Sequence, residues 1–507
     1  MKYAFRKRAA ALACTALLGL GTFSCQNDLL NVKPVTLLDA GLAFDTPSRV
    51  LAQVNGLYSY VKVGGFLGGR YQIYGDIRAN DFINRTSNSV TGLAVWNHTL
   101  AETSQNDVVS VWGNAYAAIN QVNIFLAGLD ANTAKLSAAP FPTNYAGTVT
   151  NYRGEARLLR ALSYYALLQL YARPYIDGNG SRPGVPLRLT PETMQGNNDL
   201  ARSTVAQVYD QILLDLNFAE QSLPLSYGPG LNVTRAHRNT AIALKTRVYL
   251  TMGRYDDVVR EANKLVPANG SSGTYMATTG VSNGLNPSII SVFTAPQETT
   301  ESILSFPFTA QDAPGTQNQL AYYYLPTALG GNGEYGLNTG AGSLFANTAF
   351  AATDVRRTSF IAPISTTVNG VTRTEYFLSK YPTGSPYTDK APVIRYSEVM
   401  LSLAEALVRT TNTVDTRALD LLNAVRNRSN GGTYTATALT PTSLIDAILL
   451  ERRIEFLGEG IRNIDLMRLN ATIPGKGTVS AVPATAANYV WPIPSTELST
   501  NNLMTRN

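Results

Sequence analysis

Helical periodicity near the end of the chain is the feature that most restricts the fold. Between positions 391 and 469, apolar residues recur at steps of three and four, which is typical of one buried helix face. The first such face is formed by Tyr396, Val399, Met400, Leu403, Ala404 and Leu407. Residues 418–425 repeat the pattern. A third helix is expected to begin at Thr440-Pro441, because the hydroxyl can cap free N–H groups and proline fits the first helical position.

Helices in this chain are expected to come in pairs. Residues 238–249 and 255–266 flank a short turn at Gly253, and their apolar residues can face one another. This plan resembles a tetratricopeptide hairpin, and residues 397–428 repeat it. Because stacked pairs bury their apolar faces only against neighbours, several are needed, and we count about four. The predicted fold class is all-α: tetratricopeptide-like helix pairs with long loop insertions and a few short strands.

Two long stretches, residues 68–105 and 267–392, lack sustained helical spacing. Long segments without regular structure inside a compact domain are usually functional. Short strands are expected within the second stretch, at 302–308 and 372–378. Residues 331–336 match the glycine pattern of dinucleotide-binding loops, but no buried strand precedes them and no helix follows. We therefore interpret them as a flexible loop.

Charged residues crowd the region around positions 451–468. Glu451, Glu455 and Glu459 are four residues apart, so they share one helix face. Such a cluster could serve acid/base chemistry or bind a metal. Alternatively, the neighbouring arginines neutralise the acids in a network of ion pairs. We favour the ion-pair network, because catalytic carboxylates need surroundings that push their pKa values apart rather than a surplus of arginine.

Several long blocks resemble the signature segments of the SusD/RagB family. They are RYSEVMLSLAEA at 395–406, ALDLLNAVRNRS at 418–429, ERRIEFLGEGIRNIDLMRL at 451–469 and the closing YVWPIPSTELSTNNLMTRN at 489–507. In the first half, VWGNAYAAINQVNIFL and YRGEARLLRALSYYALLQLYARPY also resemble this family. The resemblance covers nearly all of the mature chain.

The resemblance implies a function and a partner. SusD/RagB proteins are helical, nutrient-binding lipoproteins of the outer membrane of Bacteroidota. By this likeness we expect the protein to bind a glycan or oligosaccharide without catalysis and without a cofactor or metal. It would deliver that ligand to a SusC-type TonB-dependent transporter and would lie outside the cell.

The N-terminus has the pattern of a secretory leader. Basic residues at 2–8 precede an apolar stretch at 9–20, which is too short to span a bilayer. The chain has two cysteines, Cys14 and Cys25, and Ser24 is a small residue before a cleavage point. We expect cleavage before Cys25 and attachment of a lipid to that residue, which would consume an otherwise unpaired thiol. Plain cleavage with a free thiol is the alternative.

These features divide the chain into three parts. We expect a signal peptide at 1–24, a SusD-like helical part with the first ligand loop at 25–266, and a second part with a loop-rich insertion and closing helices at 267–507. No later run of about twenty apolar residues is present, so no transmembrane helix is expected.

Charge and histidine content exclude several functions. The formal charge is +6, but four basic residues belong to the leader, and the remaining 37 basic residues nearly balance 35 acidic ones. This balance gives no support for nucleic-acid binding. Only two histidines are present, which argues against a histidine-based zinc site or catalytic triad.

Aromatic and polar residues on the two long stretches are the candidate ligand groups. Aromatic rings stack on the C–H faces of sugars, and Asp, Asn and Arg pair with sugar hydroxyls. The candidates are Tyr71, Tyr74, Asp81, Arg85 and Trp96 on the first stretch and Tyr322, Tyr323 and Tyr324 on the second. By the family resemblance, Asp81, Arg85 and Trp96 match the placement of the first ligand loop best.

Two other functions stay open. The first is peptide binding, as in the RagB branch of the family. The second is glycoside hydrolysis, which needs two carboxylates at a defined separation across a cleft. Asp76, Asp81 and Glu102 are the only acids on the first long stretch, and nothing in the sequence fixes their geometry.

Some conspicuous residues have ordinary structural explanations. Trp112 lies at helical spacing and is expected in the core, and Trp491, between Val490 and Pro492, is expected to pack inside as well. His98 is expected to be a hydrogen-bonded loop residue rather than a ligand group.

Overall fold

The computed structural model describes residues 42–194, 196–268, 275–369 and 371–507. The predicted signal peptide and Cys25 lie outside these ranges. Within them, helices predominate and strands occur only as short pairs, which confirms the predicted fold class.

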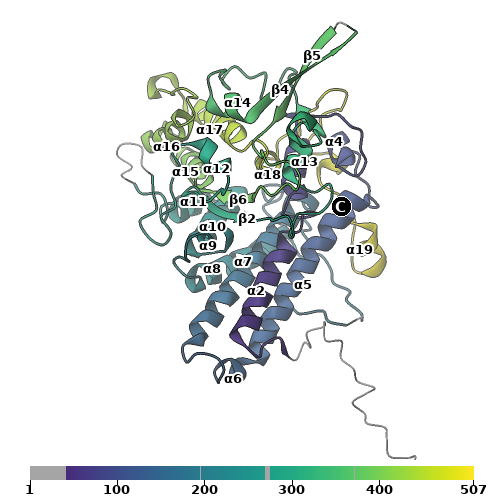
Figure 1. The fold of residues 1–507 in the computed structure, drawn as a ribbon, viewed down its shortest axis with the longest axis vertical. Coiled ribbons are helices and arrows are strands. Elements are labelled where there is room, and N and C mark those ends of the chain that lie inside the picture. Colours follow the sequence, from purple (N-terminus) through teal and green to yellow (C-terminus); the bar gives the residue numbers. More distant parts are fainter. Residues whose placement is uncertain (1–41, 195, 269–274, 370) are drawn as a thin grey trace, which may run out of the picture.

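Four long helices build the elongated part of the molecule. They are α2 (Pro47–Val61), α5 (Ser110–Ala131), α7 (Tyr145–Tyr171) and α8 (Val205–Ser222). Helix α7 packs against each of the other three, and Figure 1 shows α2, α5 and α7 side by side. Thr204 and Gln207 form a capping box at the start of α8, which satisfies N–H groups that the helix leaves unpaired.

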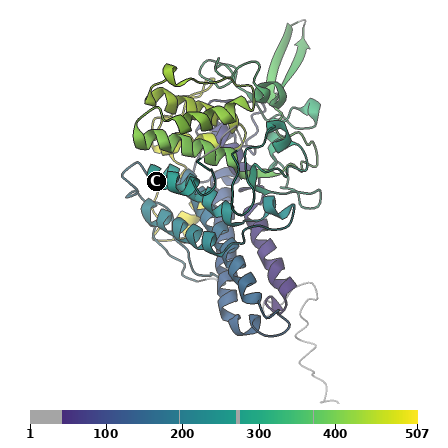
Figure 2. The same cartoon turned by 90° about the vertical axis from the view of Figure 1, so that its left-hand side faces the viewer.

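The stack continues through the helix pairs expected from the sequence. Helix α10 (Arg238–Thr251) packs on α8 and on α11 (Tyr255–Ala262), and α11 packs on α15 (Tyr396–Thr411). Helix α15 in turn contacts α16 (Thr416–Asn427) and α17 (Pro441–Glu455), and α18 (Ile461–Arg468) closes the series. Figure 2 shows these pairs as layers. The tetratricopeptide-like plan and the start of α17 at Thr440-Pro441 are confirmed.

The described chain has three pairs of antiparallel strands, and two of them join distant parts of the sequence. Strand β1 (Phe82–Asn84) pairs with β3 (Tyr335–Leu337), and β2 (Ser302–Phe306) pairs with β6 (Ala391–Arg395). Strands β4 (Ile361–Val368) and β5 (Val371–Leu378) form a hairpin that stands out from the body in Figures 1 and 2. The strands expected near 302–308 and 372–378 are therefore confirmed.

Short helices cover much of the remaining chain. They are α3 (Arg70–Ile77), α4 (Leu93–Asn97), the π-helix η2 (Gln105–Val109), α6 (Thr133–Leu136), α9 (Leu231–Thr234), α12 (Ile289–Phe293), α13 (Leu320–Tyr324), η4 (Thr327–Leu329), α14 (Val355–Phe360), η5 (Ala436–Ala438), η6 (Ala487–Tyr489) and α19 (Ser495–Thr500). The expectation that residues 68–105 lack regular structure is wrong. Helix α3 is buried on nearly every side, so it has no apolar stripe for periodicity to detect.

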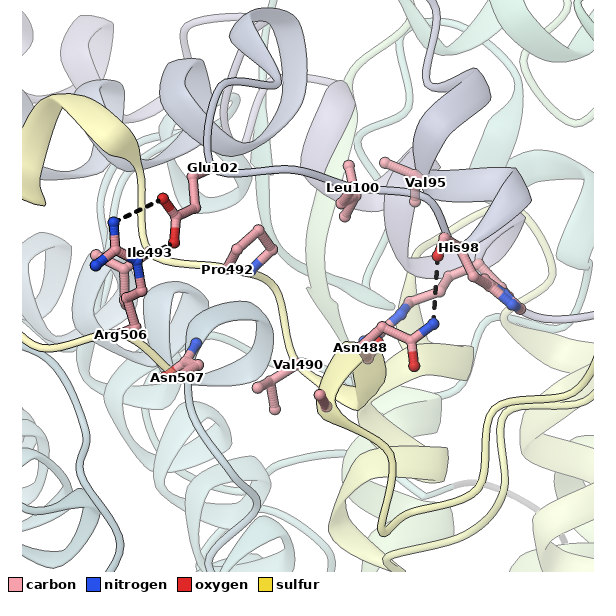
Figure 3. Close-up of a pocket in the computed structure, with 12 residues that line it drawn as sticks. Val95, His98, Leu100, Glu102, Asn488, Val490, Pro492, Ile493, Arg506 and Asn507 are labelled. Atoms are coloured by element: carbon pink, nitrogen blue, oxygen red, sulfur yellow. Dashed lines mark hydrogen bonds and ion pairs between the residues drawn. The ribbon is translucent and has the colours of Figure 1, made fainter.

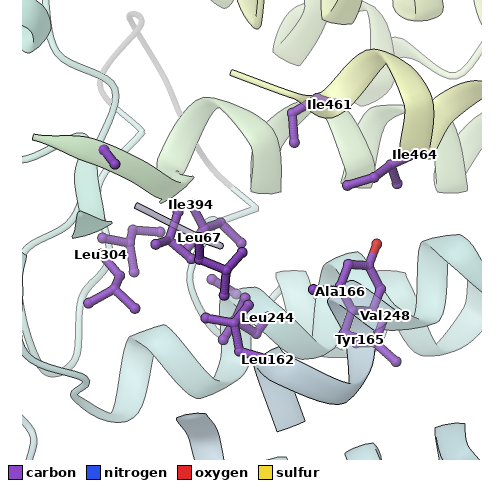
Figure 4. Close-up of a cluster of buried hydrophobic side chains, with 14 of the residues drawn as sticks. Leu67, Leu162, Tyr165, Ala166, Leu244, Val248, Leu304, Ile394, Ile461 and Ile464 are labelled. Carbon is purple, nitrogen blue, oxygen red and sulfur yellow. The ribbon is translucent and has the colours of Figure 1, made fainter. Parts of the chain in front are cut away.

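One apolar core holds the layers together. Figure 4 shows Leu162 and Tyr165 of α7, Leu244 and Val248 of α10, Leu304 of β2, Ile394 of β6 and Ile464 of α18 in one cluster. Trp112 and Trp491 are buried as predicted. The long helices and the strand pair β2–β6 therefore form a continuous scaffold beneath the loops.

Glu451, Arg452 and Glu455 of α17 lie inside this scaffold. Glu455 accepts hydrogen bonds from Arg356 and Arg395 at 2.9 Å each and from Arg428 at 2.5 Å. Burial alone would raise the pKa of Glu455, but Arg428, Arg395 and Arg356 outweigh it and hold the pKa well below its usual range. Further buried pairs are Glu451–Arg426, Glu459–Lys380, Asp465–Arg452 and Glu405–Arg468. The ion-pair interpretation is confirmed.

Candidate ligand-binding face

The two long stretches of the sequence meet where β1 pairs with β3. Phe82 lies opposite Leu337, and Asn84 lies opposite Tyr335. The N–H of Arg85 donates to the carbonyl of Glu334 at 3.0 Å and so extends the pairing by one residue. The interpretation of residues 331–336 as a flexible loop is wrong at its end, because Tyr335 and Gly336 belong to β3.

Arg85 is fixed at this junction and remains exposed to solvent. Its Nε and Nη2 donate to the two carboxylate oxygens of Glu375 on β5, at 2.8 and 2.6 Å. Its Nη1 donates to the carbonyl of Gly333 at 3.1 Å, and the guanidinium carbon lies 4.7 Å from the ring centroid of Phe377. A Cβ at Gly336 would lie 3.1 Å from Cδ of Arg85, so this glycine leaves room for the side chain.

Half-buried aromatic rings lie on the segments that hold Arg85 and Glu375. Tyr322 on α13 meets the ring of Tyr387 edge-on, with 5.9 Å between ring centroids. Tyr376, next to Glu375 on β5, packs against Phe345 with centroids 4.5 Å apart. The carbonyl of Tyr322 accepts from the N–H of Asn332, which connects α13 to the segment that holds Arg85. We call Arg85, Glu375 and these four rings the ligand face.

Trp96 lies on the short helix α4 and is bonded to β1. Its indole N–H donates to the carbonyl of Phe82 at 2.9 Å, and Nζ of Lys476 lies 5.7 Å from the indole centroid. The ring is half-buried. These contacts fix the orientation of Trp96 and leave part of its surface accessible.

Four of the predicted site residues are buried, so the expectation that they face a ligand is wrong for this structure. They are Tyr74, Asp81, Tyr323 and Tyr324. Asp81 accepts from Arg453 on α17 and from the N–H of Leu344 at 2.8 Å. Burial alone would raise the pKa of Asp81, but Arg453 lowers it below its usual range. Asp81 therefore joins a loop to the scaffold.

The buried tyrosines follow from the geometry of one short helix. Consecutive residues of a helix point in different directions, so Tyr322 faces outward while Tyr323 and Tyr324 face inward. The hydroxyl of Tyr323 donates to the carbonyl of Gln317 at 2.9 Å, and the ring of Tyr324 lies 4.9 Å from that of Phe82. Tyrosine tolerates such sites because its polar tip finds a partner inside.

Tyr71 lies away from the ligand face. Its ring contacts Phe66 edge-on at 6.4 Å, and together with Tyr165 and Arg247 it borders a small internal cavity of about 20 Å³. Burial raises the pKa of Tyr71. The structure therefore holds Arg85 and Tyr322 on the same short segment at 332–333, ties Trp96 of α4 to β1 through Phe82, and separates Tyr71 from them.

Sequence reasoning missed Glu375, Tyr376, Phe345 and Tyr387. The first two lie on the strand predicted at 372–378, where residues up to Glu375 are exposed and Phe377 and Leu378 are buried. A short strand with a polar outer end is a signal that could have pointed to Glu375. Phe345 and Tyr387 lie in irregular segments, and no spacing in the sequence connects them with β5.

A separate cavity of about 240 Å³ lies where residues 95–102 meet the C-terminal segment. Figure 3 shows Arg506 donating to Glu102, at 2.6 Å, and Asn488 donating to the carbonyl of His98, at 3.3 Å. His98 is hydrogen-bonded as predicted, with Nε2 at 2.8 Å from the carbonyl of Arg78. Burial, together with Lys476, lowers the pKa of His98 to about 4, so the ring is neutral at pH 7.

Comparison with known proteins decides the family. Residues 51–250 match the family described as starch-binding and associating with the outer membrane, and residues 365–507 match the SusD family. A crystal structure of a SusD superfamily protein from Bacteroides fragilis is 31% identical with a TM-score of 0.76, covering 91% of this chain and 99% of that one. The chain belongs to the SusD superfamily.

Other SusD proteins extend this result. A SusD superfamily protein from Bacteroides thetaiotaomicron has the same fold, with a TM-score of 0.75 at 23% identity over 91% of this chain and 99% of that one. The SusD-like protein P38 of Formosa agariphila is 23% identical over 83% of each chain. This is a family of glycan-binding proteins associated with the outer membrane. Among the described residues, none of the helices is long and apolar enough to span a bilayer.

Proposed function

We propose that this SusD protein binds a glycan or oligosaccharide at the ligand face and does not alter it. The observation that carries the proposal is the exposed Arg85–Glu375 pair, which is fixed by paired hydrogen bonds on segments that also carry half-buried aromatic rings. Sugar rings can stack on such aromatic surfaces, while their hydroxyl groups pair with a guanidinium and a carboxylate. The bonds to Glu375 and Gly333 do not use every N–H of Arg85, so it can still donate to a ligand.

The acids of the first loop support binding without hydrolysis. Asp76 accepts from the N–H of Gly460 inside the protein, and Asp81 is paired with Arg453. Glu102 is paired with Arg506. A glycosidase needs two carboxylates available on either side of the scissile bond. Asp76 and Asp81 are therefore taken up inside the protein, and Glu102 lies in an exposed ion pair at the other cavity.

The family suggests where the protein works and with what partner. We propose that it is lipid-anchored at Cys25, faces outward from the outer membrane, and delivers its ligand to a SusC-type TonB-dependent transporter. We also keep the division into residues 25–266 and 267–507, because the two matched segments fall one in each part. The Cys25→Ala variant is expected to leave the membrane fraction. Continued membrane association of that variant would contradict the anchor.

A binding screen tests the ligand class. The purified mature protein is applied to arrays of neutral oligosaccharides, including malto-oligosaccharides, and in parallel to a peptide library. We expect glycan binding that weakens about tenfold in Arg85→Ala, because hydrogen bonds to a charged group are lost. Arg49→Ala is the matched control: Arg49 is also an exposed, ion-paired arginine, but it lies on α2. Binding of peptides and of no glycan would overturn the proposal.

A further inference from the structure

A second, larger cavity lies beside the one in Figure 3. Its volume is about 530 Å³, within the range of roughly 300–1,000 Å³ that is usual for small-ligand pockets. It lies between the loop that follows α7 and the C-terminal segment, and the two cavities share Ala487, Val490, Arg506 and Asn507 in their walls. It shares no lining residue with the ligand face. We call it the arginine cleft.

Positive charge dominates the side chains that line the arginine cleft. Arg173, Arg182, Arg202 and Arg506 contribute guanidinium groups, and Asp177 is the one acidic side chain of the described lining. Asp177 accepts from Arg173 at 2.6 Å and from Arg182 at 3.2 Å, so a single carboxylate serves two cations. The lining therefore carries an excess of positive charge.

Arg202 adds to this excess because its hydrogen bonds go to neutral oxygens. It donates to the carbonyls of Pro183 and Gly184, at 3.0 and 2.7 Å, and to the side-chain oxygen of Asn507, at 2.7 Å. Such bonds orient the guanidinium but do not neutralise it. Burial lowers the pKa of Arg202 to about 10, so the group keeps its charge at pH 7.

Arg506 is only weakly compensated. Its partner Glu102 lies on the side of the neighbouring cavity, and the Arg506 side chain is 69% exposed. Exposed ion pairs of this kind contribute little and are screened by salt, so a ligand can replace them. Arg182 is also weakly compensated, because its side chain is 56% exposed and it shares Asp177 with Arg173.

The cleft also offers apolar surface next to its charges. Val490 and Ala486 line it, and Arg173 lies with its guanidinium carbon 5.0 Å from the ring centroid of Tyr489. A ligand that suits this site has an anionic group for the arginine forks and C–H surface for the apolar wall. Planar guanidinium forks match carboxylate and sulfate-like oxygen groups in particular.

We propose that the arginine cleft binds an anionic sugar unit, that is, a saccharide carrying a carboxylate or a sulfate ester. This inference rests on the proposed glycan-binding function but places a second, charge-selective site away from the ligand face. The two sites together would let the protein hold a chain that has both neutral and acidic units.

Calorimetric titration with defined oligosaccharides tests the inference. The mature protein is titrated with maltotriose, with trigalacturonate and with a sulfated neutral trisaccharide, at low and at high sodium chloride. We expect one or both anionic probes to bind, with affinity that falls as salt rises. The two anionic arms show whether the cleft prefers carboxylate or sulfate. Equal affinity for maltotriose and both anionic probes, or binding of neither anionic probe, would overturn the inference.

Variants assign the binding to the cleft. Arg182→Ala is expected to weaken the anionic probe about five- to tenfold and to leave maltotriose unaffected. Arg254→Ala is the matched control, because Arg254 is also an exposed arginine that pairs with a nearby aspartate, on α11. Arg85→Ala should weaken maltotriose and spare the anionic probe. Loss of anionic binding in Arg85→Ala but not in Arg182→Ala would contradict the arginine cleft while supporting the ligand face.

Discussion

Two arginine–glutamate pairs in this protein have the same chemistry and opposite surroundings. Arg395 and Glu459 lie inside the scaffold, where Nε and Nη2 of the arginine donate at 2.8 and 2.7 Å. Arg85 and Glu375 make almost the same two bonds on the ligand face, but both residues are exposed. An exposed pair contributes roughly 0–1 kcal/mol, whereas removing one partner of a buried pair costs about 3–5 kcal/mol.

Under the proposed function, this contrast would let the protein bind a ligand without disturbing its fold. Water competes for the exposed pair, so a sugar hydroxyl can replace water there at little cost. The buried pairs cannot exchange partners, because each charge would be left in a medium that solvates it poorly. The scaffold is therefore expected to keep its shape, whereas the proposed ligand face can exchange its partners.

The largest expected effect comes from breaking the buried network. Glu455→Ala would leave Arg356, Arg395 and Arg428 short of a shared partner and is expected to destabilise the protein by about 3–5 kcal/mol. Denaturant unfolding followed by circular dichroism measures the change. A loss below about 1 kcal/mol would show that the network is no more important than a surface pair.

The next effect compares neighbouring rings on α13. Tyr324→Ala removes a fully buried ring and is expected to cost about 3–5 kcal/mol, whereas Tyr322→Ala on the half-exposed side should cost less than about 1 kcal/mol. Melting temperatures of the two variants make the comparison. Equal losses would mean that α13 does not divide its tyrosines between core and ligand face.

Acid sensitivity gives a smaller effect from the same network. Burial alone would raise the pKa of Asp465, but Arg452 and Arg468 lower it to about 2, below the unfolded value of roughly 3.9. The folded-state pKa is depressed, so this stabilisation is fully present above about pH 5 and is lost as pH falls toward 2. The expected contribution is roughly 2–3 kcal/mol.

Unfolding measured from pH 7 down to pH 2 tests this expectation. Asp465→Asn should be less stable than the wild type at pH 7, and the difference should shrink as the pH falls. A difference that stays constant over this range would show that Asp465 is not held ionised by its arginines.

The smallest expected effect is on the ligand face. Arg85→Ala is expected to change the free energy of unfolding by less than about 1 kcal/mol, because its pair with Glu375 is exposed. The melting temperature should stay close to that of Arg49→Ala. A loss as large as that of Glu455→Ala would place Arg85 in the scaffold and contradict the contrast between the two regions.

The parts of the fold that depend on local chemistry were predictable from sequence. The helix pairs around Gly253, the capping box at Thr204 and the start of α17 at Thr440 all follow from spacing and capping within a few residues. The ion pairs of Glu451, Glu455 and Glu459 were also predictable, because arginines accompany them in the sequence.

The candidate site was only partly predictable, because its contacts join distant residues. Arg85 meets Glu375 across 290 positions, and no periodicity reports such a pairing. Aromatic residues on irregular segments resemble exposed ligand groups, yet Tyr74 and Tyr323 fill space between loops and scaffold. Composition shows that rings are present but not which way they point.

A crystal structure of the protein with its bound oligosaccharide tests the central claim most directly. We predict density for the sugar over Arg85 and Glu375, in contact with the ring of Tyr322 or Tyr376, and unchanged bonds between Glu455 and its arginines. Sugar density that contacts neither Arg85 nor these rings, or a rearranged network around Glu455, would contradict the separation of a fixed scaffold from an exchangeable ligand face.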